Sequence, residues 1–262
     1  LLSAGEHFFA YKHEENAKSL FWRTFPAYAA KLAGKKCVQL PSTLGPFETD
    51  RSSALLSSLL GLTDALAVRD ARSLQLLKTR YATEKPLLLD PAFFLHSPVA
   101  TQQAQKKHGA TALVMRSEGW GIRLSNASRK EQTERFKASG YEASKAFAFS
   151  LEFASRLLNT TDEVLRVFVQ TTADQELADE LGRRLPEFLE SGRLTIERPY
   201  AVQDYLSRLA GVDRVVSNRF HALILGMVVG RQTHGLYFDV HGHKIPGLFN
   251  LIESPGRCHN LS

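Results

Sequence analysis

The sequence predicts an α/β protein that contains two doubly wound parallel sheets. Short apolar segments such as 65–68, 112–116 and 165–170 alternate with longer segments of helical periodicity. Continuous apolar strands that alternate with helices are typical of a parallel sheet covered on both faces. The alternation stops at the polar, proline-containing segment 95–107 and then starts again. This interruption indicates a linker between two domains.

The N-terminal domain is predicted to span residues 1–98. Gly34 ends its first helix as a C-cap, and either Asp70 or Ser73 caps its third. The expected order is a strand and glycine turn in 1–9, a helix at 16–32, a strand at 37–40, a helix at 52–61, a strand at 65–68, a helix ending at 77 and a strand at 87–89.

The C-terminal domain is predicted to span residues 108–250, and residues 251–262 form a tail. The expected order is a strand at 112–116, a helix at 142–158, a strand at 165–170, a helix at 174–185, a strand at 194–197, a helix at 202–209, a strand at 215–216, a helix ending near 229 and a last strand at 235–239.

Bulk composition narrows the class of ligand. The chain has 262 residues and a formal net charge of +6, which favours anionic partners. Its basic residues are scattered rather than gathered with interleaved aromatics, so we expect no nucleic-acid partner. No apolar run approaches the roughly 18 residues that a membrane span needs, so we expect no span in this chain. The sequence predicts no particular oligomeric state.

The segment 215–230 carries the clearest candidate site. A short apolar strand runs into a polar turn at 217–219, and an apolar helix follows. A helix N-terminus at such an edge offers N–H groups and partial positive charge to an anion. Arg219 and His221 lie there, a permanent cation beside a group that titrates near neutrality. The alternative is that Arg219 pairs with a surface carboxylate and His221 caps the helix.

Six motifs follow one another along the chain, at residues 40–47, 67–73, 89–93, 113–116, 219–224 and 239–244. In this order they resemble the polysaccharide pyruvyltransferase family. The resemblance covers roughly residues 1–249 and implies two Rossmann-like domains similar to the GT-B glycosyltransferase fold. It also implies that the N-terminal domain is incomplete, because the family has an earlier βα unit.

The resemblance implies an enzyme that moves an enolpyruvyl group from phosphoenolpyruvate to a sugar hydroxyl and forms a pyruvate ketal. The acceptor would be a glycan or glycolipid precursor in polysaccharide biosynthesis, and phosphoenolpyruvate would be the donor substrate without a further cofactor. No metal is expected, since the sequence has no Asp-x-Asp pair and no His/Cys cluster at ligand spacing. The compartment would be the cytoplasm for a bacterial-type relative and the Golgi lumen for a eukaryotic-type one.

Two other functions stay open. The same helix N-terminus suits the diphosphate of a nucleotide sugar, as in a GT-B glycosyltransferase. The chain also departs from the family at Ser42, Thr43 and Gln232, and in the middle of its last motif. A carbohydrate-binding pseudoenzyme without activity is therefore the second alternative.

The donor residues are expected in the second domain. The resemblance marks Arg116 as a phosphoenolpyruvate ligand, and the alternative is a surface ion pair. We expect Arg116 to be catalytic together with His221, which we choose as the acid–base or phosphate-binding histidine. Arg219 binds the same anion or holds the turn. Phe220 lies between Arg219 and His221 in the motif and is a further candidate ligand residue. Lys244, in a loop beyond the last strand, is either a ligand or a solvated lysine.

The acceptor residues are expected in the first domain, with the ligands facing the cleft between domains. Arg69 ends a strand and can reach that cleft. Ser42 and Thr43 can bond sugar hydroxyls or stabilise their turn. Glu6, in an early turn, is a candidate acceptor ligand or acid–base carboxylate.

Overall fold

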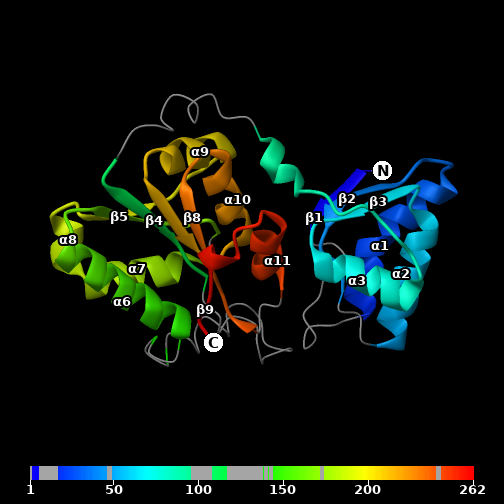
Figure 1. The fold of residues 1–262 in the computed structure, drawn as a ribbon, viewed down its shortest axis with the longest axis horizontal. Helices are drawn as coiled ribbons and strands as arrows, with labels where there is room; N and C mark the ends of the chain where they lie inside the picture. Colours follow the sequence, from blue (N-terminus) through cyan, green and yellow to red (C-terminus); the bar gives the residue numbers. More distant parts are fainter. Residues whose placement is uncertain are drawn as a thin grey trace. The chain divides into compact units, whose positions relative to one another are not determined.

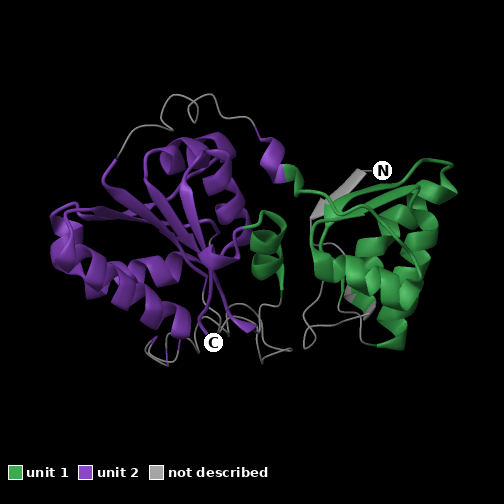
Figure 2. Ribbon diagram, in the orientation of Figure 1, with its two compact units in different colours: residues 1–91, 241–253 green, residues 92–240, 254–262 purple. Residues whose placement is uncertain are grey.

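A computed structural model of the protein describes residues 2–5, 17–45, 49–95, 108–116, 138, 141, 144–171, 174–239 and 243–262. The chain divides into two compact units, coloured in Figure 2. Unit 1 comprises Leu1–Pro91 and His241–Glu253, and unit 2 comprises Ala92–Val240 and Ser254–Ser262. Residues 241–250, which the sequence suggests for the C-terminal domain, thus group with the N-terminal unit.

Unit 1 contains a parallel sheet in the order β1-β2-β3. Its helices pack on apolar side chains such as Leu56, Leu66 and Leu77, each at most 3% exposed. Asp70 caps α3, because its carboxylate accepts the Ser73 N–H at 2.8 Å. The elements are β1 (Leu2–Gly5), α1 (Ala17–Leu32), β2 (Val38–Ser42), α2 (Asp50–Leu62), β3 (Ala65–Val68), α3 (Ala71–Tyr81) and α11 (Lys244–Leu251).

The strand predicted at residues 87–89 is wrong. Among the residues that the structure describes, this segment forms one isolated bridge, between Val68 and Leu87. Leu88 and Leu89 remain 49% and 38% exposed. Pro86 has no N–H to donate, and Pro91 ends the extended segment and starts a short 3-10 helix, Pro91–Phe94. The run is apolar, but it is too short between its prolines to add a strand to the sheet.

Unit 2 contains a six-stranded sheet in the order β6-β5-β4-β7-β8-β9. All its neighbouring strands are parallel. This is the 3-2-1-4-5-6 order of a Rossmann fold, with its switch point between β4 and β7. The elements are β4 (Ala110–Val114), α6 (Lys145–Thr160), β5 (Val164–Phe168), α7 (Gln175–Arg184), α8 (Pro186–Glu190), β6 (Leu194–Glu197), α9 (Val202–Ala210), β7 (Arg214–Ser217), α10 (Phe220–Val228), β8 (Gln232–Tyr237) and β9 (Cys258–Asn260).

Two apolar cores cover the two faces of this sheet. Leu113 and Val216 contribute to the core shared with α6 and α7, whereas Val114 and Val215 contribute to the core shared with α9 and α10. Figure 1 shows these helix pairs on opposite sides of the strands. Because successive strand side chains point to opposite faces, the doubly wound architecture follows from the near-continuous apolar strands.

Close packing fixes the position of α10. A Cβ on Gly226 would meet Thr233 Oγ1 and Val215 Cγ2, each at 3.0 Å. Only glycine therefore lets α10 lie this close to β7 and β8. The first turn of α10, with Phe220 and His221, is thereby held at the carboxyl edge of the sheet.

The structure of residues 251–262 differs from the tail that the sequence predicts. Cys258–Asn260 forms β9 and extends the sheet beside β8. The last strand predicted at 235–239 is β8, which begins at Gln232 and ends at Tyr237. Three-residue strands such as β9 lack the length for a periodic signal, and pairing with β8 rather than local pattern makes this segment extended.

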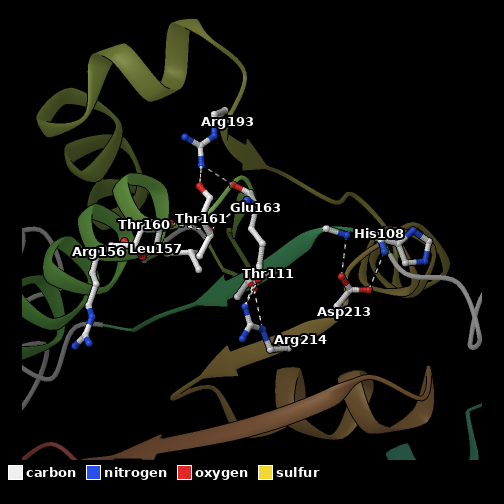
Figure 3. Close-up of polar contacts among 11 residues, drawn as sticks. His108, Thr111, Arg156, Leu157, Thr160, Thr161, Glu163, Arg193, Asp213 and Arg214 are labelled. Carbon is white, nitrogen blue, oxygen red and sulfur yellow. Dashed lines mark hydrogen bonds and ion pairs between the residues drawn. The ribbon is translucent and has the colours of Figure 1, made fainter.

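A polar network closes the amino edge of the unit 2 sheet (Figure 3). The Arg214 guanidinium contacts the Glu163 carboxylate at 2.5 Å, and Thr111 Oγ1 donates to Glu163 Oε2 at 2.7 Å. Asp213 accepts the N–H groups of His108 and Gly109, both at 2.8 Å. The polar groups at this amino edge bond to one another. We therefore expect a ligand to bind at the opposite, carboxyl edge of the sheet.

We predict that Asp213→Ala destabilises unit 2 by about 1–3 kcal/mol, because two backbone donors lose their acceptor. Burial alone would raise the pKa of Asp213, but the N–H groups of His108, Gly109 and Ala110 bring it below the usual aspartate value. Because the pKa of Asp213 is lower in the folded state, the stability that its carboxylate adds is complete above the unfolded pKa of about 3.9. This stability is lost as the pH falls through the folded pKa.

Urea unfolding at neutral and acidic pH measures the change at Asp213. The matched control is Asp162→Ala, at an exposed position, which should leave the midpoint unchanged. Equal stability of the two variants at neutral pH would contradict the assignment.

Candidate functional site

The carboxyl ends of β4 and β7 are joined by one amide side chain. Asn218 Oδ1 accepts the Arg116 N–H at 2.6 Å, and Asn218 Nδ2 donates to the Arg116 carbonyl at 2.7 Å. Asn218 is only 7% exposed. Both polar groups of the Arg116 peptide backbone are thereby fixed to the turn that precedes α10. This turn lies at the switch point of the sheet, where doubly wound folds bind ligands.

Ser217 shapes the same turn from inside. Its hydroxyl donates to the Val114 carbonyl at 2.7 Å and accepts the Arg219 N–H at 2.8 Å. Ser217 is fully buried and ends β7. Arg219 is the N-cap residue of α10. The predicted strand, polar turn and helix are therefore confirmed, with the turn shortened by one residue because Ser217 pairs with β4.

The Arg219 side chain crosses to the carboxyl end of β5. Its Nη2 donates to Thr171 Oγ1 at 2.9 Å and forms an ion pair with Asp174. Asp174 is 2% exposed and is the N-cap residue of α7, so this carboxylate is buried and is not a surface group. Removing one partner of such a pair is strongly destabilising. Holding the turn is thus the role of Arg219 that these contacts support, and a ligand role for it stays a prediction.

His221 lines a pocket of about 440 Å³ within unit 2. Phe220 packs edge-on against the His221 ring, with the ring centroids 5.5 Å apart. Other walls of the pocket come from the carboxyl ends of β5 and β6 and from α9 and α10, and they include Gln170, Tyr200 and Tyr205. Burial, followed by the charge of Asp174, raises the pKa of Tyr205. The phenol of Tyr205 is therefore protonated at neutral pH.

The candidate acceptor residues of unit 1 are buried and bonded to protein groups. Arg69 donates to Thr43 Oγ1 at 2.9 Å and forms an ion pair with Asp90. Ser42 donates to the Leu40 carbonyl at 2.6 Å. Thr43 and Ser42 are fully buried, and Arg69 is 2% exposed. The contacts support a role of these side chains in holding the loop after β2, and their role as acceptor ligands stays a prediction.

The predicted loop around Lys244 is wrong, because Lys244 is the first residue of α11. Lys244 is 6% exposed and is not a solvated lysine. Close approach of α11 to α3 buries this turn, and a Cβ on Gly247 would meet Asp70 Cβ at 3.1 Å. His243 Nε2 lies 3.1 Å from Asp70 Oδ1. Burial alone would raise the pKa of Asp70, but His243 and Ser73 bring it below the usual value.

Glu6 lies outside the described residues. Within the described ranges, no group of three or more His, Cys, Asp or Glu side chains is placed to hold a metal ion. In the same part of the chain, no helix has the length and apolarity to cross a membrane.

Sequence reasoning missed two residues that organise this site. From the sequence, Asn218 is only part of the polar turn at 217–219, and Asp174 is only the first residue of the helix at 174–185. The signal for Asn218 is its position directly after an apolar strand, where a side-chain amide can bond the neighbouring strand end. No local signal points to Asp174 as the partner of Arg219, because 45 residues separate them.

The family model for polysaccharide pyruvyl transferase matches residues 14–239. No significant match was found among curated protein sequences. Among solved structures, UDP-GlcNAc 2-epimerase from Methanocaldococcus jannaschii has a TM-score of 0.51 and 9% identity, over 90% of this chain and 62% of the epimerase. At that identity the likeness shows the fold alone, and the predicted α/β fold of Rossmann-like, GT-B-like units is confirmed.

Two further structures are similar at lower scores. Anabaena Alr3699/HepE, solved in complex with UDP and glucose, has a TM-score of 0.46 and 12% identity, and the alignment covers 84% of this chain. Escherichia coli ADP-heptose lipopolysaccharide heptosyltransferase II has a TM-score of 0.47 and 11% identity, over 90% of this chain and 71% of the transferase. The chain spans 57% of the length of HepE.

We predict that Asn218→Ala lowers the stability of unit 2 by about 1–3 kcal/mol, because the N–H and carbonyl of the half-buried Arg116 lose their partners. Thermal unfolding followed by circular dichroism measures the loss. Asn250→Ala, at an exposed helix position, is the control and should unfold like the wild type. A variant at 218 with wild-type stability would show that the amide does not join the two strand ends.

Proposed function

The chain belongs to the polysaccharide pyruvyl transferase family, and we propose that it transfers the enolpyruvyl group of phosphoenolpyruvate to a sugar acceptor and forms a pyruvate ketal. The observation that carries the proposal is the Asn218 bridge, which fixes Arg116 beside the start of α10 at the switch point of the sheet. A small polyanion needs fixed cations and N–H donors of this kind.

The reaction needs proton transfer but no redox chemistry. A proton adds to the methylene carbon of phosphoenolpyruvate, and a sugar hydroxyl attacks the adjacent cationic carbon. The carbon–oxygen bond to phosphate breaks, and a second hydroxyl closes the ketal. One hydroxyl proton ends on the new methyl group and the other on phosphate, so the atoms balance.

The residues of unit 2 divide these tasks in our proposal. His221 transfers the proton, because an imidazole can both accept and donate a proton and this one lies at the pocket wall. Arg116 binds the carboxylate or phosphate of the donor. Arg219, held by Asp174 and Thr171, adds positive charge at the same edge while it fixes the turn. Phe220 packs against His221 and limits the orientations of its ring.

Ligand-induced stabilisation tests the donor. We predict that phosphoenolpyruvate raises the melting temperature of the protein, since a ligand at 100 times its Kd stabilises by about 2.7 kcal/mol. That corresponds to a shift of several degrees for a domain of this size. Uridine diphosphate is the matched anion and should give no shift. A shift with uridine diphosphate and none with phosphoenolpyruvate would favour a nucleotide-sugar enzyme instead.

We predict that His221→Ala reduces ketal formation by about 100-fold or more, the range of general acid–base catalysis, while the melting temperature stays within a degree or two of the wild type. Phosphate release and proton NMR of the ketal methyl group measure transfer. His259→Ala, an exposed histidine on β9, is the control. Wild-type transfer by the variant at 221 would refute the role. Donor binding without turnover by the intact protein would point to the pseudoenzyme.

A further inference from the structure

The pocket beside His221 is larger than the donor requires. Its volume is about 440 Å³, within the range of about 300–1,000 Å³ typical of small-molecule sites. Phosphoenolpyruvate is smaller than this space and, as a polyanion, is assigned above to the edge that carries Arg116, which is not among the described residues that line the pocket. The pocket therefore has room for a second, ring-sized group next to the histidine.

The walls of the pocket suit a neutral ring rather than an anion. They are mainly apolar, and no lysine or arginine is among the described residues that line them. A diphosphate group would find no cation there to balance its charge. A pyranose ring, with its apolar C–H face and hydroxyl edge, matches this composition. The apolar walls are Ala92, Leu95, Pro199, Ala201, Val202 and Leu225.

Two of the residues that line the pocket, Gln170 and Tyr205, carry polar side chains. Tyr205 Oη and Gln170 Oε1 are buried, and no described residue forms a hydrogen bond with either atom. Tyr205 is only 6% exposed. Leaving buried polar atoms unpaired is costly, so a side-chain rotation that turns either atom toward a ligand hydroxyl in the pocket would be favoured. A sugar hydroxyl both donates and accepts, and can therefore serve the carbonyl of Gln170 and the phenol of Tyr205 together.

An exposed aromatic ring lies at the same pocket. Tyr200 is 89% exposed, although its backbone is fixed, because its N–H donates to Asp204 Oδ2 at 3.2 Å. Aromatic rings carry a negative face that attracts polarised hydrogen atoms. The C–H face of a sugar can stack on such a ring, and exposed tyrosines are used in this way at wet binding sites because they lose little conformational entropy.

We propose that this pocket binds the pyranose ring of the acceptor, stacked on Tyr200, with its hydroxyls bonded to Gln170 and Tyr205. The ring that carries the reacting hydroxyl then lies beside His221. This inference rests on the proposed function. It moves recognition of the acceptor ring to unit 2, in accord with the burial of Ser42, Thr43 and Arg69 in unit 1.

Saturation-transfer NMR on the full chain tests the inference with simple probes. The methyl glycosides of glucose, galactose and mannose are each added to the wild type, Tyr200→Ala and Tyr200→Phe. We expect at least one glycoside to bind the wild type, with affinity about fivefold to tenfold lower in Tyr200→Ala and unchanged in Tyr200→Phe. Gln170→Leu should also weaken binding. Trp22→Ala removes an aromatic ring that is 59% exposed in unit 1, and it should bind as the wild type does.

The outcomes separate the two proposals. Binding of no glycoside to the wild type, or equal binding to Tyr200→Ala, overturns the sugar pocket. Uridine diphosphate binding that depends on Tyr200 also overturns it and assigns the pocket to a nucleoside. If glycoside binding depends on Tyr200 but phosphoenolpyruvate gives no stabilisation, the sugar pocket stands and the proposed transfer reaction fails.

Discussion

The bonds between the Asn218 amide and the Arg116 peptide are the constraint on which the site depends. They join the ends of β4 and β7, the two strands at which the direction of chain winding reverses. Neighbouring helices diverge at such a reversal, so backbone groups there are exposed to a ligand. The Asn218 amide holds the two strand ends in place. Gly226 lets α10 pack closely on β7 and β8, and this packing positions His221 at the same carboxyl edge. The amino edge is closed by Glu163, Arg214 and Asp213, which leaves the carboxyl edge for chemistry.

Most of the fold could be predicted because its strands are buried on both faces. An apolar run such as Ala65–Val68 has one interpretation when helices flank it, and β3 has the predicted bounds. The failures are segments whose state depends on distant partners. Residues 87–89 are as apolar as β3 but lie between prolines, and they form a single bridge. β9 has no periodic signal of its own and is extended because β8 offers it an edge.

The location of the site could be predicted from the sequence, but the side-chain contacts within it could not. The strand, turn and helix around Arg219 follow from local pattern. The position of Arg116 beside this turn does not, because 102 residues separate it from Asn218. The pairing of Arg219 with Asp174 and the burial of Arg69 with Asp90 depend on contacts across 45 and 21 residues. By charge and by position near a strand end, the sequence offers Arg69, Arg116, Arg219 and Lys244 as candidate ligands. Burial separates them, because Arg69 and Lys244 are enclosed within unit 1, whereas Arg116 is half-buried at the edge of the unit 2 sheet.

A crystal structure of the full chain soaked with phosphoenolpyruvate tests the central claim most directly. The account predicts the donor at the carboxyl edge between β4 and β7, with its phosphate or carboxylate within about 2.7–3.2 Å of the Arg116 guanidinium or of N–H groups at the start of α10. Donor density in unit 1, at Arg69 or Lys244, with the edge between β4 and β7 unchanged, would contradict it.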